Sequence, residues 1–205
     1  MRKTVICNIT MKEKTDKCKY RTTDLSLPVS AREVVYPVSA FLEKTLTKND
    51  EIKAVMLVKK DPNGNYQKNA AEFVEEILAI NESIGAKIDF KTVETSFSEE
   101  QTVHEELLGK IVDEIDDKTH IIADITYGPK DLPIVLFSAM NFAEKFLECE
   151  IENIIYGQAV FKDGKPTDTK ICDMVPLYYL NSVTNTIRSE DSTRARQMLK
   201  SLLSL

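Results

Sequence analysis

The sequence predicts an α/β fold with a mostly parallel sheet and helices on both of its faces. The first observation is the alternation of short apolar runs, typical of buried strands, with longer segments whose apolar residues recur at helical spacing. The second is residues 120–147, where a buried-strand pattern, a tight polar turn and an apolar helix follow one another. Parallel strands joined by helical crossovers form a three-layer sandwich, which is the fold we expect.

Composition favours a globular protein of one domain with a small appendage. The 205 residues are 42% hydrophobic and 29% charged, values ordinary for such a domain. The net charge of −6 argues against a nucleic-acid coat, and we expect no direct DNA binding. The four cysteines form no C-x-x-C pair, and no apolar run is long enough for a signal peptide or a membrane span. We therefore expect a cytoplasmic protein with reduced thiols.

The first strand is expected at Thr4–Ile9, and a long polar segment rich in lysine follows it at Thr10–Leu27. Loops of this length are often functional, and the alternative is a solvated, mobile surface loop. Ser30 opens a capping-box pattern for a helix to about Leu46, in which Pro37 marks a kink or a late first turn. The next expected elements are strands at Ile52–Lys59 and Lys87–Val93, and helices at Tyr66–Ile84 and from Ser98 to about Ile115.

The central stretch begins with a strand at His120–Ile125, which Gly128-Pro129 ends because proline cannot donate to a strand ladder. Asp131 suits an N-cap, and an apolar helix runs from about Leu132 to Leu147. Free backbone N–H groups and a helix dipole at such a turn favour an anion, above all phosphate. Lys130 and the Thr126 hydroxyl stand where they would supplement that site.

The C-terminal part is expected to form a hairpin and a helix. A strand at Glu152–Val160, a turn at residues 163–166 and a returning strand at Thr169–Asp173 make the hairpin. Residues 177–188 carry no clear pattern, and residues 189–192 cap a last helix to Leu205. We therefore expect a domain at residues 1–180 and a helical extension at residues 181–205.

In a doubly wound sheet, ligands bind beyond the carboxyl ends of the strands, where the strand order reverses. The end of the first strand (Asn8, Ile9, Thr10) and the turn after the fourth (Thr126 to Lys130) should meet there. No G-x-G-x-x-G, P-loop, G-x-S-x-G or H-E-x-x-H motif is present, so we expect no ordinary dinucleotide site and no metal site.

Two residues in these strands allow two interpretations each. Asp124 is acidic within an apolar strand, and it either binds a ligand or, as we favour, hydrogen-bonds the N–H groups of the following turn. Tyr156 precedes Gly157 at the end of the next strand and either stacks on a base or packs internally. The histidines, His104 and His120, are expected at a helix surface and a strand entry.

The segment Asp124-Ile125-Thr126-Tyr127-Gly128-Pro129-Lys130-Asp131-Leu132-Pro133, with the apolar helix and Tyr156-Gly157 after it, resembles the CRISPR-associated Rossmann-fold (CARF) domain family. It is most similar to the branch with an Asp-[Ile/Leu]-Thr-His-Gly-x-Arg-x-Leu-Pro motif. Tyr127 replaces the usual histidine, and Lys130 or Asp131 stands near the arginine position. Asn8-Ile9-Thr10 is similar to the family's other ligand-contacting motif. The resemblance implies a Rossmann-like sandwich over about residues 1–180.

The resemblance further implies a sensor of cyclic tetra- or hexa-adenylate, the second messenger of type III CRISPR antiviral immunity, bound across a homodimer axis. It implies no cofactor, and an effector domain that lies outside this chain. The residues expected to contact the ring are Asn8, Ile9, Thr10, Met11, Asp124, Thr126, Tyr127, Gly128, Pro129, Lys130, Tyr156 and Gly157. Some relatives also cleave the ring without metal, for which Thr10, Thr126 and Lys130 are the candidate catalytic residues.

Three other functions remain open at this point. A ring nuclease is the alternative to a pure sensor. A transcription regulator is disfavoured, because the chain is acidic and has no helix-turn-helix with a basic second helix. A Rossmann-like protein for another nucleotide would share the same fold and the same strand-end location of the site.

Overall fold

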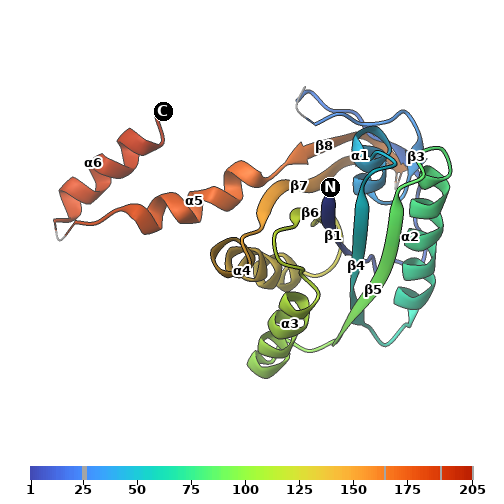
Figure 1. The fold of residues 1–205 in the computed structure, drawn as a ribbon, viewed down its shortest axis with the longest axis horizontal. Coiled ribbons are helices and arrows are strands. Elements are labelled where there is room, and N and C mark those ends of the chain that lie inside the picture. The colour runs from blue at the N-terminus through green and yellow to red at the C-terminus, as the bar shows by residue number, and fades with distance from the viewer. Residues whose placement is uncertain (25–26, 164, 190, 205) are drawn as a thin grey trace. The chain divides into compact units, whose positions relative to one another are not determined.

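The computed structural model describes residues 1–24, 27–163, 165–189 and 191–204. The chain divides into two compact units, Met1–Asp173 and Met174–Leu205. The first unit holds a six-stranded sheet and four helices, and the second holds helices α5 (Val175–Thr186) and α6 (Ser192–Leu202), as Figure 1 shows. Among the described residues, none of the helices has the length and apolar character needed to span a bilayer.

The sheet has the strand order β5-β4-β1-β6-β7-β8, with β1 and β6 at its centre. Its first five strands are parallel, and β8 returns antiparallel to β7 as the expected hairpin. The predicted α/β class, with a mostly parallel Rossmann-like sheet, is therefore confirmed. The strands are β1 (Arg2–Asn8), β4 (Glu51–Lys60), β5 (Lys87–Ser96), β6 (His120–Asp124), β7 (Glu150–Lys162) and β8 (Lys165–Asp173).

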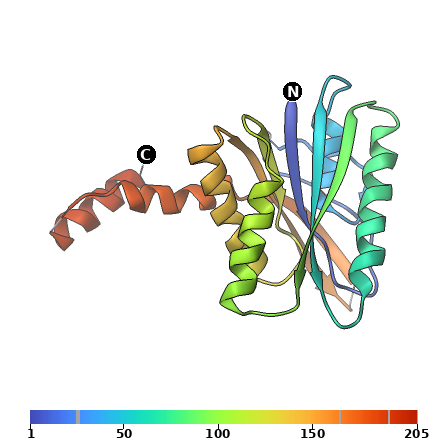
Figure 2. The same ribbon diagram turned by 60° about the horizontal axis from the view of Figure 1, so that its bottom comes forward.

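Helices cover both faces of the sheet (Figure 2). Helices α1 (Pro37–Thr45) and α2 (Asn65–Asn81) pack on one face, and α3 (Gln101–Asp113) and α4 (Asp131–Phe146) pack on the other. The central strand β1 is buried on both sides, because Val5 joins the core beneath α1 and α2 while its fully buried neighbour Ile6 lies outside that core cluster. This explains why β1 reads as a continuous apolar run instead of an alternating one.

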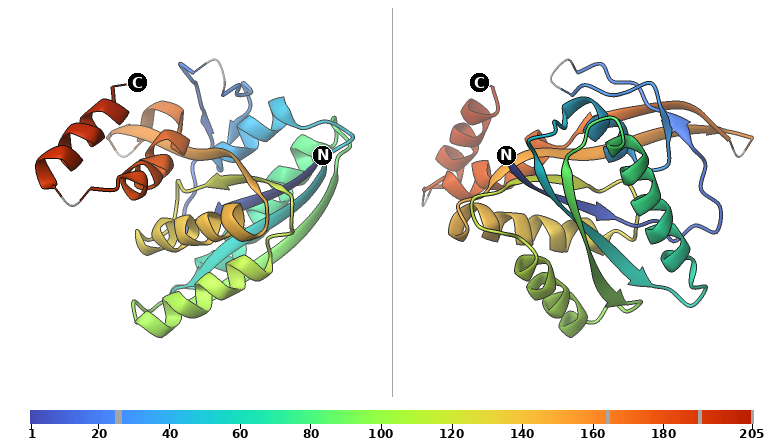
Figure 3. Two further views of the ribbon diagram at one scale, coloured as in Figure 1. Left: turned by 60° about the vertical axis from the view of Figure 1, so that its left-hand side comes forward. Right: turned by 45° about the vertical axis from the view of Figure 1, so that its right-hand side comes forward.

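The segment after β1 is held at several points along its length, although most of its side chains are exposed. It contains a short strand, β2 (Cys18–Lys19), that pairs antiparallel with β3 (Glu33–Val34). The Asn69 side-chain amide on α2 donates to the Thr10 and Lys12 carbonyls at 2.6 and 2.9 Å. Farther on, the segment runs along β8, beside the β7–β8 hairpin (Figure 3). Several expected features include residues outside the described ones: 25–26 of the loop, 164 of the turn, 190 of the last helix cap and 205 at the end of that helix.

The expected helix start at Ser30 is wrong, because α1 begins at Pro37. The reason is a contact that local sequence does not reveal. The Glu76 carboxylate on α2 accepts hydrogen bonds from the Val35 and Tyr36 backbone N–H groups at 2.7 and 3.1 Å. This carboxylate holds the chain just before α1, and Pro37 then occupies the first turn, where its missing N–H costs nothing.

Two other expected caps also differ from the structure. The N-cap of α3 is Glu100 instead of Ser98, and α4 starts at Asp131 itself with Lys130 in the N-cap position. In contrast, the predicted cap of the last helix includes the true one. The Asp191 carboxylate accepts a hydrogen bond from the Arg194 N–H at 2.7 Å.

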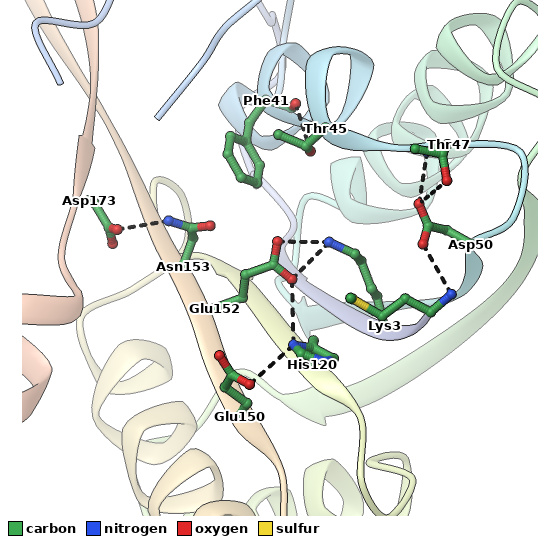
Figure 4. A network of polar contacts seen from close by, with 11 residues as sticks. Lys3, Phe41, Thr45, Thr47, Asp50, His120, Glu150, Glu152, Asn153 and Asp173 are labelled. Carbon is green, nitrogen blue, oxygen red and sulfur yellow. Dashed lines mark hydrogen bonds and ion pairs between the residues drawn. The ribbon is translucent and has the colours of Figure 1, made fainter. Parts of the chain in front are cut away.

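The amino-terminal edge of the sheet is closed by ion pairs (Figure 4). Lys3 is only 6% exposed, and its ammonium lies 2.7 and 2.8 Å from the two carboxylate oxygens of Glu152. Beside this pair, the Asn153 side-chain amide donates to the Asp173 carboxylate at 2.8 Å. A buried ammonium needs such a partner, and Glu152 provides it for Lys3.

We predict that Glu76→Ala lowers the free energy of unfolding by about 2–3 kcal/mol, because it leaves two backbone N–H groups without their acceptor. Glu76→Gln keeps one acceptor oxygen and should lose less. The control is Glu75→Ala on the exposed face of the same helix, expected within about 0.5 kcal/mol of wild type. Urea unfolding measures all three, and equal losses for Glu76→Ala and Glu75→Ala would contradict this assignment.

Candidate functional site

The strand order reverses at the centre of the sheet. From β1 the chain proceeds to β4 and β5 on one side, and then crosses back to β6, β7 and β8 on the other. β1 and β6 are hydrogen-bonded neighbours, with Cys7 opposite Asp124 in the register. The segments that leave these two strands therefore start side by side at the carboxyl edge, as predicted, and this is where open α/β sheets bind ligands.

A cavity of about 390 Å³ lies at this edge. It is enclosed by the segment after β1, the turn after β6 and the β7–β8 hairpin. Seven of the residues expected to contact a ligand line it: Thr10, Met11, Thr126, Tyr127, Gly128, Tyr156 and Gly157. The other lining residues are Lys12, Lys14, Thr15, Asp16, Cys18, Tyr20, Ala159, Phe161 and Pro166.

Five expected contact residues do not line the cavity. Asn8, Ile9 and Asp124 are almost fully buried beneath it, and Pro129 and Lys130 lie beyond its rim. The burial of Asn8 and Ile9 follows from their place at the end of the central strand. The Asn8 amide is buried, with neither its oxygen nor its nitrogen hydrogen-bonded within the described residues.

Asp124 shapes the cavity from below. Its carboxylate accepts the Val38 N–H at the start of α1 and the Thr126 N–H of the following turn, both at 2.9 Å. Complete burial raises the pKa of Asp124 to about 6, and hydrogen bonds from Thr126 and Val38 only partly oppose that rise. The interpretation that Asp124 fixes the turn therefore agrees with these contacts.

Thr126 and Gly157 hold the turn against β7. The Gly157 N–H donates to the Thr126 hydroxyl oxygen at 2.8 Å. A Cβ atom at Gly157 would collide with the Pro37 ring and would lie 3.1 Å from the Thr126 methyl group. Only glycine fits here, and the Thr126 hydroxyl is already engaged within the protein.

Tyr127 takes the place of the histidine in the resembled motif, and its role is partly structural. Its phenol donates to the Val35 carbonyl at 2.9 Å, and its ring meets the edge of the Tyr36 ring. Burial raises the pKa of Tyr127, so the phenol stays neutral and its proton stays on this internal bond. Tyr127 thus lines the cavity while its hydroxyl is hydrogen-bonded within the protein.

The cationic groups of the cavity come from the segment after β1. Lys12 and Lys14 both line it, together with the acidic Asp16. The Lys12 ammonium lies 5.6 Å from the centre of the Phe161 ring and 6.0 Å from that of Tyr127, within reach of cation–π attraction. From the sequence we expected the cation at Lys130, although residues 10–27 are rich in lysine.

The Asp131 carboxylate already occupies the start of α4, so this helix end is a poor binding site for a phosphate. The Asp131 carboxylate lies in the first turn of the helix and 2.7 Å from the Lys59 ammonium, which is only 1% exposed. Glu99 binds the same ammonium at 2.6 Å, and His104 lies beside both carboxylates. Glu99, His104 and Asp131 have the ligand atoms of a cation site, but a protein ammonium already pairs with both carboxylates.

The raised pKa of Asp124 predicts a pH dependence of stability. The folded state keeps the proton up to about pH 6, whereas the unfolded chain loses it near pH 4, so the contribution of this group falls as the pH rises between these values. The two-unit difference corresponds to roughly 3 kcal/mol. Urea unfolding from pH 4 to 7 should therefore show wild type losing about this much relative to Asp124→Asn.

The control for this experiment is Asp16→Asn, which removes a carboxylate that is exposed at the cavity. Its stability difference from wild type should change little over the same pH range. A pH-independent difference between wild type and Asp124→Asn would show that the buried carboxyl does not titrate in this range.

Comparison with known proteins identifies no family for this chain. No protein-family model matches the chain, and no curated protein matches it in sequence. The position of the cavity and the chemistry of its lining are therefore the basis on which a function is proposed.

Proposed function

We propose that the chain binds cyclic oligoadenylate, a ring of four or six adenylates, in the cavity at the carboxyl edge of β1 and β6. The observation that carries this proposal is one cavity at the strand-order switch that combines two lysines with exposed aromatic rings. Because residues 124–133 resemble the CARF motif, we propose that the chain is a sensor in type III CRISPR antiviral signalling. It would act on an effector outside this chain.

The lining suits the two halves of a nucleotide. The ammonium groups of Lys12 and Lys14 attract phosphates, which carry the charge of the ring. The rings of Tyr156 and Phe161 are 38% and 55% exposed and offer flat surfaces on which adenine bases stack. Thr10 and the backbone of the turn after β6 add hydrogen-bonding groups for ribose or base.

The size of the cavity favours a dimer. At about 390 Å³ it is near the lower end of pockets that bury a drug-sized ligand, so one copy holds only part of a ring of four or six nucleotides. A ring with an even number of identical units has two-fold symmetry, and so does a dimer of identical subunits. Two cavities that face a shared two-fold axis would each bind one of the two equivalent halves of the ring.

Binding without cleavage is the favoured activity. Metal-independent cleavage requires a ribose 2′-hydroxyl in line with the adjacent phosphate and a cation at the developing charge. Of the candidate catalytic residues, Thr126 already hydrogen-bonds the Gly157 N–H, and Lys130 lies outside the cavity. The three candidate catalytic residues therefore do not lie together in the cavity, whereas the residues proposed to bind the ring line one cavity.

Binding should depend on the lysines of the cavity. We expect cyclic tetra- or hexa-adenylate to raise the melting temperature of the full chain and to bind with a micromolar or lower Kd by calorimetry. Lys12→Ala and Lys14→Ala should each weaken binding about tenfold, as expected for loss of one charge-assisted contact. Lys130→Ala is the matched control and should change the Kd less than twofold.

Absence of binding by rings of three to six units would overturn the proposal. Loss of binding in Lys130→Ala but not in Lys12→Ala would move the site to the start of α4. Incubation of the ring with the full chain and EDTA, followed by chromatography, tests the alternative activity. Linear products that form in proportion to the amount of protein would show a ring nuclease.

A further inference from the structure

The segment after β1 carries the lysines of the cavity, and one face of α2 holds this segment. The polar residues of that face are spaced three and four positions apart, so they form one stripe along the helix: Asn65, Lys68, Asn69 and Glu72. Each of these side chains is hydrogen-bonded to residues 10–15. The stripe therefore fixes the path of a segment that lines the cavity.

Asn69 makes the central contact of this stripe. Its side-chain amide nitrogen donates to the Thr10 carbonyl at 2.6 Å and to the Lys12 carbonyl at 2.9 Å. Asn69 is completely buried, and its amide oxygen has no hydrogen-bond partner among the described residues. In these contacts the amide acts as a donor, and it joins two carbonyls of the segment to α2.

Both polar groups of the Lys12 backbone are held within the protein. The Lys12 N–H donates to the Thr10 hydroxyl oxygen at 3.2 Å, and the Lys12 carbonyl accepts from Asn69. The side chain that leaves this backbone places its ammonium 5.6 Å from the centre of the Phe161 ring at the cavity. Because a fixed backbone limits where a side chain can point, these bonds orient the Lys12 ammonium before a ligand binds.

The neighbouring contacts of the stripe are more exposed. The Lys68 ammonium donates to the Glu13 carbonyl at 3.3 Å at the surface, and a part-buried bond of 2.8 Å joins the Thr15 hydroxyl to the Glu72 carboxylate. Water competes for such groups, whereas the buried Asn69 amide has no water to replace the carbonyls that it binds. Asn69 is therefore the member of the stripe that we expect to control the position of Lys12.

We propose that Asn69 is a positioning residue for the anionic ligand, because it holds the Lys12 backbone so that the ammonium of this lysine faces the cavity. Asn69 is not among the residues that line the cavity, so it acts through Lys12. The inference rests on the proposed function for the identity of the ligand, a ring of adenylates. The hold of Asn69 on residues 10–12 is a property of the chain alone.

The test compares Asn69→Leu, which keeps the branched shape of the side chain but cannot donate, with Asn81→Leu. Asn81 is the matched control, because its amide binds the Ala86 backbone at 2.8 and 2.9 Å at the other end of α2 and does not line the cavity. Both variants should be less stable in urea. Only Asn69→Leu should weaken binding of cyclic tetra- or hexa-adenylate to the full chain, by about three- to tenfold, the cost of ordering one free side chain.

A double-mutant cycle shows whether Asn69 acts through Lys12. In a Lys12→Ala background no ammonium is left to position, so Asn69→Leu should then change the Kd less than about 1.5-fold. Asn81→Leu should leave the Kd unchanged in both backgrounds. Thr10→Val removes the hydroxyl that accepts the Lys12 N–H and should show the same dependence on Lys12, so the test does not rely on one variant.

Hydrogen exchange separates this inference from the proposed function. In the ligand-free full chain, Asn69→Leu should speed exchange of the Lys12 N–H about tenfold, and Asn81→Leu should not. If wild type binds no ring, the proposed function fails, and the exchange rates decide whether Asn69 holds the segment. Equal exchange in wild type and Asn69→Leu would overturn the inference, and so would a loss of ring binding in Asn69→Leu that is the same with and without Lys12.

Discussion

The Asp124 carboxylate joins the end of the central strand β6 to the beginning of α1. It accepts one N–H from Val38 and one from Thr126, and its side chain is completely buried. The turn after β6 therefore has a fixed path, and the residues that follow, Tyr127 and Gly128, reach the cavity wall in one arrangement. The path of one wall of the proposed site therefore depends on this contact.

Keeping a carboxylate in this place costs stability. Burial raises the pKa of Asp124 to about 6. Near neutral pH the carboxylate is therefore charged in surroundings that favour the neutral acid. Protein groups at functional edges are often kept in such unfavourable states when geometry requires it. In this structure, the fixed turn places the Thr126 hydroxyl where it accepts a hydrogen bond from the Gly157 N–H. The turn and β7 therefore form one wall of the cavity.

The strands, the helices and the place of the cavity could be predicted from the sequence because they follow from local patterns. Features that depend on contacts between distant residues could not. Apolar runs and helical spacing are local, so the parallel sheet and the meeting of Thr10 with Thr126 follow from them. The start of α1 does not, because its backbone N–H groups bind Glu76, which is 41 positions from Val35 in the sequence. The two lysines that line the cavity were not predicted either. Lys130 is near the turn in sequence, but Asp131 and Lys59 already neutralise the start of α4, and the cavity instead draws on Lys12.

The two edges of the sheet differ in how far their charges are satisfied. At the amino edge, the buried Lys3 ammonium is paired with both oxygens of Glu152. At the carboxyl edge, the charged residues that line the cavity are Lys12, Lys14 and Asp16, and backbone N–H groups hold the Asp124 carboxylate that is buried beneath them. Two lysines beside exposed aromatic rings, in a chain whose net charge is −6, are a local feature that global composition hides. These lysines are the reason that we propose an anionic ligand at the strand-order switch of a protein that is acidic as a whole.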